Sequence, residues 1–241
     1  MGIPKRIHYC WFGGAPLDET AQRCMKTWER FCPGYEIVRW DESNSPLTDN
    51  DYVRQAYEKG KWAFVSDYVR LAALCREGGI YLDTDVELVA PLDEFLSHDA
   101  VLGFESDEYV ATCFMAAAPG HALFCQAREM YRTASFLRAD GTADETTNVE
   151  RITRLLLEHG LKRGNMRQSV CGTEIFPSEV FSPKDLQTGR IRITGNTRAI
   201  HHFNASWMSA RQRFHTRVAQ ILGPRLTQGV KRILRILRRD K

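Results

Sequence analysis

The chain lacks any apolar run long enough to cross a membrane. No segment approaches the roughly 18 consecutive apolar residues that a spanning helix needs, and residues 1–14 contain no apolar stretch typical of a secretory signal. Internal repeats are also absent. The 241 residues are 43% hydrophobic and 26% charged, which is typical of one globular body that can bury a sizeable core. We therefore expect a soluble catalytic or binding domain.

Closely spaced cysteine pairs are missing as well. The chain has seven cysteines, an odd number, without a C-x-x-C pair, and most have apolar neighbours. This pattern favours reduced core thiols over disulfides or a zinc site. It predicts a cytoplasmic location. The cysteines are at positions 10, 24, 32, 75, 113, 125 and 171.

Strand and helix patterns alternate along residues 1–210, which predicts an α/β domain with a mainly parallel, partly mixed central sheet flanked by helices. The expected strands are 5–12, 35–40, 80–82, 100–104, 109–117, 190–193 and 198–203, the last two closing the sheet. The expected helices are 17–31, 50–59, 63–77, 121–137 and 145–159.

Two carboxylates follow the short apolar strand 80–82. Asp83 and Asp85 are two positions apart, so in extended backbone both side chains point the same way. Ligands of α/β sheets collect where such strands end, and two carboxylates there can share Mg²⁺ or Mn²⁺ with a diphosphate. On the preceding helix, Asp67 and Arg70 are neighbours at i and i+3.

These motifs together form a signature longer than D-x-D alone. S-D-x-x-R at residues 66–70, G-G-I-Y at 78–81 and D-T-D at 83–85 resemble the DXD glycosyltransferases related to Och1-like mannosyltransferases, and more distantly the glucosylating domains of clostridial toxins. The resemblance implies a GT-A-like fold and sugar transfer from a nucleotide-sugar donor. It implies that Asp67 and Arg70 hold the donor sugar and its phosphate side, that Asp85 is the direct metal ligand, and that Asp83 contacts the metal through water or the ribose.

Both ends of the domain extend this resemblance. Residues 3–14, I-P-K-R-I-H-Y-C-W-F-G-G, are similar to the family's first strand, which implies that Trp11, with Phe12 beside it, meets the donor nucleotide. Residues 199–207, A-I-H-H-F-N-A-S-W, resemble the family's closing H-H-x-x-x-S-W, which maps the metal ligand onto His202 and the diphosphate contacts onto Ser206 and Trp207. His201 is an equal candidate for the ligand.

The implied reaction uses Mn²⁺ or Mg²⁺ and proceeds with retention of anomeric configuration. A UDP-sugar is favoured as donor and a GDP-sugar is the alternative. The acceptor is expected to be a glycan or a lipid-linked sugar in the biosynthesis of a capsule, lipopolysaccharide or other surface polysaccharide. Glu105, Asp107 and Asn148 are candidate acceptor-side groups.

Residues 211–241 differ in composition from the rest. They hold ten Lys or Arg and one acidic residue, a formal charge of +9, so residues 1–210 carry −6 of the total +3. Apolar residues recur at three and four positions opposite the basic ones, which predicts amphipathic helices. We expect this second segment to contact an anionic membrane at the inner face of the plasma membrane, with core packing as the alternative and nucleic acid disfavoured. The apolar positions are Val218, Ile221, Leu222, Leu226, Val230, Ile233, Leu234 and Leu237.

Two other functions fit parts of the pattern. D-T-D-V-E superficially resembles the D-x-D-x-T/V start of haloacid-dehalogenase phosphatases. At the last position of that motif, however, this chain has Glu87. A non-catalytic, membrane-associated binding protein would use the basic segment and leave D-x-D inert. Metal-dependent turnover of a sugar nucleotide distinguishes the transferase from both.

Overall fold

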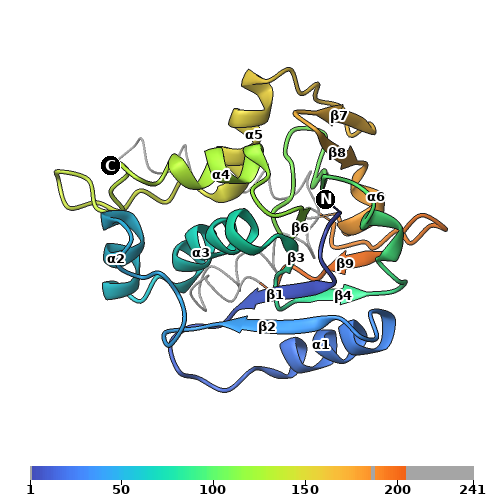
Figure 1. The fold of residues 1–241 in the computed structure, drawn as a ribbon, viewed down its shortest axis with the longest axis horizontal. Coiled ribbons are helices and arrows are strands. Elements are labelled where there is room, and N and C mark those ends of the chain that lie inside the picture. The colour runs from blue at the N-terminus through green and yellow to red at the C-terminus, as the bar shows by residue number, and fades with distance from the viewer. Residues whose placement is uncertain (1, 186–187, 205–241) are drawn as a thin grey trace, which may run out of the picture. The chain divides into compact units, whose positions relative to one another are not determined.

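The computed structural model describes residues 2–185 and 188–204. Over these residues the chain is an α/β structure with a mixed seven-stranded sheet (Figure 1), which confirms the predicted fold class. The strands are β1 (Arg6–Cys10), β2 (Glu36–Trp40), β3 (Gly79–Leu82), β4 (Val86–Leu88), β5 (Ala100–Gly103), β6 (Phe114–Ala117), β7 (Gln168–Val170), β8 (Thr173–Phe176) and β9 (Ala199–His201). The helices are α1 (Glu19–Phe31), α2 (Asp51–Glu58), α3 (Trp62–Glu77), α4 (Ala122–Glu129), α5 (Asn148–Glu158) and α6 (Ser178–Phe181), with a 3₁₀ turn, η1 (Asp93–Phe95).

The chain divides into two compact units. The first comprises residues 1–183 and 193–202 and contains every helix and strand named above. In the second, the described residues include a short turn in which Lys184 bridges Ile191. The boundary predicted at residue 210, and the amphipathic helices predicted over 211–241, lie outside the described residues. None of the described helices is both long and apolar enough to cross a membrane.

The sheet order is β2-β1-β3-β6-β5-β8-β7. Strands β1, β2 and β3 are mutually parallel, and β5 is parallel to β8, while β6 and β7 run antiparallel to their neighbours. The carboxyl ends of β1 and β3 therefore lie at one edge of the sheet. This edge carries Trp11 after β1 and Asp83 after β3.

Alternate side chains of the central strands enter two cores, one on each face of the sheet. Tyr81 and Met115 pack with α2, α3, α4 and α5, whereas Ile80 and Phe114 pack with α1, α6, β4 and β9. Because β3 is buried along its whole length, its end is a fixed support for the carboxylates that follow.

Two glycines make the sharp turn from α3 into β3. Gly78 has φ 64° and Gly79 has φ 96°, in the region that favours glycine. A Cβ at Gly78 would lie 2.6 Å from the Pro119 ring, and a Cβ at Gly79 would lie 2.8 Å from the Arg6 carbonyl oxygen. The turn therefore returns the chain directly from the helix that carries Asp67 and Arg70 to the strand that ends at Asp83.

Several predicted elements differ from the structure. Residues 190–193 form no strand, because Ile191 and Ile193 are 42% and 62% exposed and have no core to cover. Strand β9 does not close the main sheet; it pairs with β4 in a separate two-stranded sheet. Strands β7 and β8, which sequence patterning missed, extend the main sheet instead.

Three other elements are shorter than predicted. Residue 110 makes only an isolated bridge with Phe104, so the strand expected over 109–117 begins at Phe114. Helix α4 ends at Glu129; residues 130–133 form a turn, and Leu137 makes an isolated bridge with Ala143. Helix α5 begins at Asn148 because the Thr147 side chain accepts the backbone N–H of Glu150, which fixes the cap.

The prediction that all cysteines are reduced is wrong. Cys75 on α3 and Cys125 on α4 form a disulfide, with their Cα atoms 5.0 Å apart. The helices pack side by side, a relationship that the sequence does not reveal across 50 residues. The predicted cytoplasmic location was based on reduced cysteines, and this pair does not meet that condition. Cysteines 10, 24, 32 and 113 are buried free thiols, and Cys171 is exposed.

Candidate metal and donor site

Asp83 and Asp85 lie in a tight turn between β3 and β4. The backbone N–H of Asp83 donates to the carbonyl oxygen of Cys113, the residue before β6, at 2.9 Å, and the N–H of Val86 donates to the Asp83 carbonyl oxygen, at 3.0 Å. These bonds fix the turn on both sides. The Asp83 and Asp85 side chains are 26% and 16% exposed, so solvent reaches both carboxylates.

Strand β9 brings a histidine to this turn. Val86 pairs with His201 across the β4–β9 sheet, and the His201 Nε2 atom lies 3.3 Å from Asp85 Oδ1. One ligand atom each from Asp83, Asp85 and His201 lie within 4.8 Å of one another. Two carboxylate oxygens and one imidazole nitrogen suit Mn²⁺ or Mg²⁺, since carboxylates are the usual ligands of both ions and imidazole suits transition metals.

The adjacent histidine faces another partner. His202 Nε2 lies 2.7 Å from Glu87 Oε2, while its backbone N–H donates to the Asp85 carbonyl oxygen at 3.0 Å. Successive residues at a strand end point to opposite sides. The structure therefore brings His201 to the two aspartates, and it does not bring the side chain of His202, the ligand that the sequence motif favoured.

Charges around His201 favour its protonated form in the metal-free protein. Burial lowers the pKa of His201, but neighbouring Cys113 and the Asp85 carboxylate outweigh this effect and hold the pKa well above its usual value. Burial also raises the pKa of the Cys113 thiol. A cation bound between the aspartates would replace the imidazolium charge.

Arg70 connects helix α3 to the D-x-D turn. Its Nη2 atom lies 3.1 Å from Asp83 Oδ1 and 3.4 Å from Asp67 Oδ1. The guanidinium also donates to the Thr112 carbonyl oxygen at 2.9 Å and lies 4.5 Å from the centre of the Tyr81 ring. Although burial opposes the charge, the two aspartates keep the pKa of Arg70 raised, so the buried guanidinium stays charged.

Asp67 is held from behind by helix α5. The backbone N–H of Asn148 donates to Asp67 Oδ2 at 3.1 Å, and the Asn148 amide donates to the Asp67 carbonyl oxygen at 2.6 Å. Burial raises the pKa of Asp67 to about 6, although Arg70 and the Asn148 hydrogen bond both oppose the shift. Asn148 is only 1% exposed, and its Oδ1 accepts from Tyr131. Asn148 therefore holds the Asp67 side chain in position.

The other candidate acceptor-side residues lie in different surroundings. Burial raises the pKa of Glu105, and the charges of His201 and Asp83 also act on that pKa, which places Glu105 near the cluster. Asp107 is an exposed loop residue whose carbonyl oxygen accepts the N–H of Gly164.

The aromatic residues after β1 differ in burial. Trp11 is partly buried, and its indole N–H donates to the Ala15 carbonyl oxygen at 2.6 Å. Phe12 is only 6% exposed and packs in the core beneath α3. Sequence reasoning missed Trp62, which is 37% exposed and lies against Gly13, where a Cβ would come within 2.7 Å of the indole nitrogen. Ser206 and Trp207 lie outside the described residues.

Comparison with known proteins finds a family match over the part of the chain that carries this site. Residues 18–102, which include Asp67, Arg70 and both aspartates of the turn, match the family described as "Glycosyltransferase sugar-binding region containing DXD motif". The match covers 85 of the 241 residues and agrees with the resemblance seen in the motifs.

Two curated proteins are similar over shorter parts of their own lengths. The Legionella pneumophila protein "Subversion of eukaryotic traffic protein A" is 29% identical over 38% of this chain and 18% of its own length. "Inositol phosphoceramide mannosyltransferase 3" of Schizosaccharomyces pombe is 31% identical over 52% of this chain and 36% of its own. The chain thus spans about a fifth and about a third of these relatives.

Solved structures of glycosyltransferases show a more distant likeness. "PaToxG Glycosyltransferase" aligns with a TM-score of 0.49 and 16% identity, over 65% of this chain and 69% of that one. A glycosyltransferase involved in glycosylation of the major capsid of PBCV-1 aligns with a TM-score of 0.47 and 12% identity, over 88% and 98% of the two chains.

Proposed function

We propose that this protein is a metal-dependent glycosyltransferase that moves a hexose from a nucleotide-sugar donor to a glycan or lipid-linked acceptor. The observation that carries the proposal is the convergence of Asp83 and Asp85, which lie in the region that matches DXD glycosyltransferases, with His201 from strand β9. Asp83, Asp85 and His201 would hold Mn²⁺ or Mg²⁺, with Asp85 as the direct carboxylate ligand.

Cleavage of the donor demands stabilisation of a leaving diphosphate. When bound, the divalent ion supplies a Lewis acid that neutralises the negative charge developing on that diphosphate. Arg70 supplies a second fixed positive charge on the same side, because its guanidinium is locked by Asp67, Asp83 and the Thr112 carbonyl. Preorganised charges of this kind need little rearrangement during the reaction.

Donor sugar and nucleotide would contact the residues around this centre. Asp67, supported by Asn148, would accept hydrogen bonds from sugar hydroxyls, and Trp11, which follows β1, would stack on the base, a contact worth roughly 1–3 kcal/mol. Phe12 supports the loop from the core. Ser206 and Trp207 would complete the diphosphate contacts.

The donor chemistry follows the same proposal. An aromatic stacking position favours uridine, with guanosine as the alternative, and transfer would retain the anomeric configuration. The relative named as a mannosyltransferase supports a hexose as the transferred group. The product would be a capsule, lipopolysaccharide or other surface polysaccharide.

Residues 211–241 would bring the enzyme to its acceptor. Their formal charge of +9 would attract the segment to the anionic inner face of the plasma membrane, at about 1 kcal/mol per basic residue near the surface. Residues 1–210, at −6, would be repelled by it. Co-sedimentation of the full chain with anionic and neutral vesicles tests this part; binding that ignores vesicle charge would contradict it.

Turnover of sugar nucleotides tests the main proposal. UDP-hexoses and GDP-hexoses should be hydrolysed or transferred only with Mn²⁺ or Mg²⁺. A phosphohydrolase would instead cleave phosphate monoesters, and a membrane-associated binding protein would turn over neither class.

A further inference from the structure

A second concave site lies at the far end of the β4–β9 sheet from the metal cluster. It is a pocket of about 290 Å³, close to the lower end of the roughly 300–1,000 Å³ that small-molecule sites occupy. Across this sheet Val86 pairs with His201 and Leu88 with Ala199, and Arg198 comes next. At roughly 3.3 Å per residue, Arg198 is on the order of 10 Å along the strand from His201.

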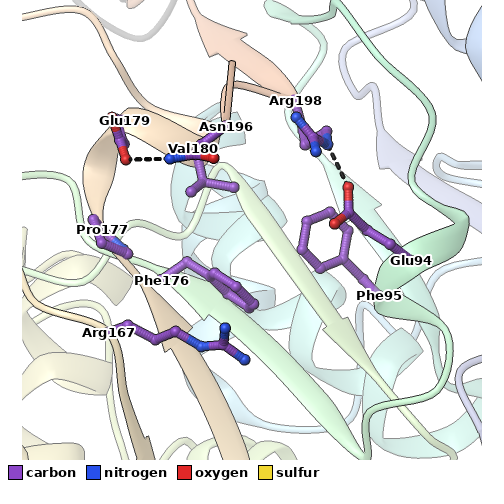
Figure 2. Close-up of a pocket in the computed structure, with 9 residues that line it drawn as sticks. All are labelled: Glu94, Phe95, Arg167, Phe176, Pro177, Glu179, Val180, Asn196 and Arg198. Carbon is purple, nitrogen blue, oxygen red and sulfur yellow. Dashed lines mark hydrogen bonds and ion pairs between the residues drawn. The ribbon is translucent and has the colours of Figure 1, made fainter. Parts of the chain in front are cut away.

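The pocket combines apolar side chains with two pairs of polar side chains that already contact each other, as Figure 2 shows. Phe176 and Pro177 are partly exposed and supply the apolar floor, with the buried Phe95 ring packed edge to face against Phe176 at 5.3 Å between ring centres and Arg167 over the Phe176 ring. On one side, the Asn196 amide donates to Glu179 at 2.9 Å. On the other, Arg198 Nε pairs with Glu94. The two pairs lie on different sides of the phenylalanine rings (Figure 2).

The charge of the lining selects against an anion. Arg167 and Arg198 are matched by Glu94 and Glu179, so the pocket has no net formal charge. Each guanidinium already has an acidic partner, since Arg167 also lies 3.3 Å from Glu174. A phosphate or carboxylate ligand would have to compete with these carboxylates. A neutral molecule would not.

Paired planar groups around an aromatic floor match the chemistry of a sugar ring. Adjacent sugar hydroxyls each donate and accept a hydrogen bond. In an amide–carboxylate or guanidinium–carboxylate pair, the N–H groups can donate to these hydroxyls and the carboxylate oxygens can accept from them. The C–H face of a pyranose can cover the apolar floor. Among the described residues, the partners of Arg198 contact only Nε and Nη1, which leaves Nη2 able to donate.

We propose that this pocket binds one neutral hexose unit of the glycan acceptor, away from the unit that receives the new sugar. The role in transfer rests on the proposed function; binding of the sugar does not. The rigid β4–β9 sheet would then join the two sites, because Arg198 borders the pocket and His201 belongs to the metal cluster.

Binding of neutral glycosides tests the proposal directly. Saturation-transfer NMR with the full chain would use methyl α-mannoside, methyl α-glucoside and methyl α-galactoside as probes, with glucose 6-phosphate as the anionic comparison. We expect at least one neutral glycoside to bind with a dissociation constant on the order of millimolar, as suits a ligand of this size, and glucose 6-phosphate to bind more weakly.

Variants locate the binding. Asn196→Ala combined with Glu179→Gln should weaken it at least about fivefold, since one or two hydrogen bonds are lost, while the bond from Thr197 to the Glu179 backbone oxygen remains. Arg132→Ala removes a comparable exposed arginine–glutamate pair elsewhere and should leave binding unchanged. Asp85→Ala should also bind the glycoside normally, even where sugar transfer fails.

Each result has a clear meaning. Binding lost in the pocket variant but kept in Asp85→Ala supports a separate sugar site, whether or not the transferase proposal holds. No glycoside binding, equal binding by the pocket variant, preference for glucose 6-phosphate, or loss of binding in Asp85→Ala would overturn it.

Discussion

Arg70 Nη2 lies 3.1 Å from Asp83 Oδ1 and thereby joins helix α3 to the first aspartate of the D-x-D turn. Both the helix and the turn are anchored in the buried sheet, so this ion pair is held in one geometry. The guanidinium side chain is 6% exposed. Removal of Arg70 would leave the buried Asp67 carboxylate without its cation, and loss of one partner of a buried ion pair typically costs 3–5 kcal/mol.

Arg70→Lys should therefore be strongly destabilising. An ammonium cannot keep the bonds to Asp83 and the Thr112 carbonyl while also covering the Tyr81 ring. We expect a loss of about 3 kcal/mol in the free energy of unfolding, measured by urea denaturation. Arg54→Lys, at an exposed arginine paired with Asp51 and Glu58, should change it by less than about 0.5 kcal/mol. Equal effects would contradict the role given to Arg70.

The two histidines at the end of β9 should differ in their effect on metal binding. His201→Ala removes a ligand and should weaken Mn²⁺ binding at least about tenfold, measured by calorimetry. His202→Ala removes only the partner of Glu87 and should weaken it much less. If His202→Ala is the more damaging change, His202 and not His201 is the metal ligand.

The disulfide between α3 and α4 should stabilise the fold around α3, the helix that carries Asp67 and Arg70. Closing a loop of 50 residues constrains the unfolded chain, and removal of such a bond typically costs 2–4 kcal/mol. We expect Cys75→Ser with Cys125→Ser to lower the unfolding free energy by about this amount, and dithiothreitol to have a similar effect on the wild type. Cys171→Ser, at the exposed free cysteine, is the control. Seven titratable thiols in the unreduced, denatured protein would show that the bond is absent.

His8 should make stability depend on pH. Its Nδ1 accepts the Trp40 indole N–H at 3.0 Å, so Nε2 carries the proton and donates to the Gly78 carbonyl at 2.9 Å. Burial lowers the pKa of His8 from its usual 6.5 despite the Gly78 bond. Between the lowered pKa and 6.5 the unfolded chain binds more protons, so the contribution is complete above about pH 6.5 and falls as the pH decreases.

The loss should approach about 1.4 kcal/mol per pH unit below pH 6.5, measured by denaturation at several pH values. His8→Gln removes the titration and should flatten this part of the profile, although its stability at pH 7.5 will be lower. His159→Gln alters an exposed histidine and should retain the wild-type slope. A steep slope that survives in His8→Gln assigns the effect to other groups.

Local patterns predicted the parts of the site that lie close together in the chain. The period of α3 places Asp67 beside Arg70, and the Gly78-Gly79 turn leads directly to β3 and Asp83; both relationships are present. Such features depend on neighbouring residues, so spacing and turn chemistry suffice to infer them.

Pairings between distant segments could not be predicted in the same way. The choice between His201 and His202 depends on the register of β9 against β4, and a shift of one residue would exchange the two. The Cys75–Cys125 bond and the pocket between η1, β8 and Arg198 likewise depend on tertiary packing. The strand predicted at 190–193 failed because alternation alone does not show whether a core is available to cover it.

The central claim is that Asp83, Asp85 and His201 hold the metal on which sugar transfer depends. The most direct test measures release of nucleoside diphosphate from UDP-hexoses and GDP-hexoses, with and without Mn²⁺, in the wild type, Asp85→Asn and Glu87→Gln. We predict Mn²⁺-dependent release that falls at least about a hundredfold in Asp85→Asn, equivalent to ~2.7 kcal/mol of transition-state stabilisation, and largely persists in Glu87→Gln. Release that needs no divalent metal, or that Asp85→Asn retains at the wild-type rate, would contradict the account.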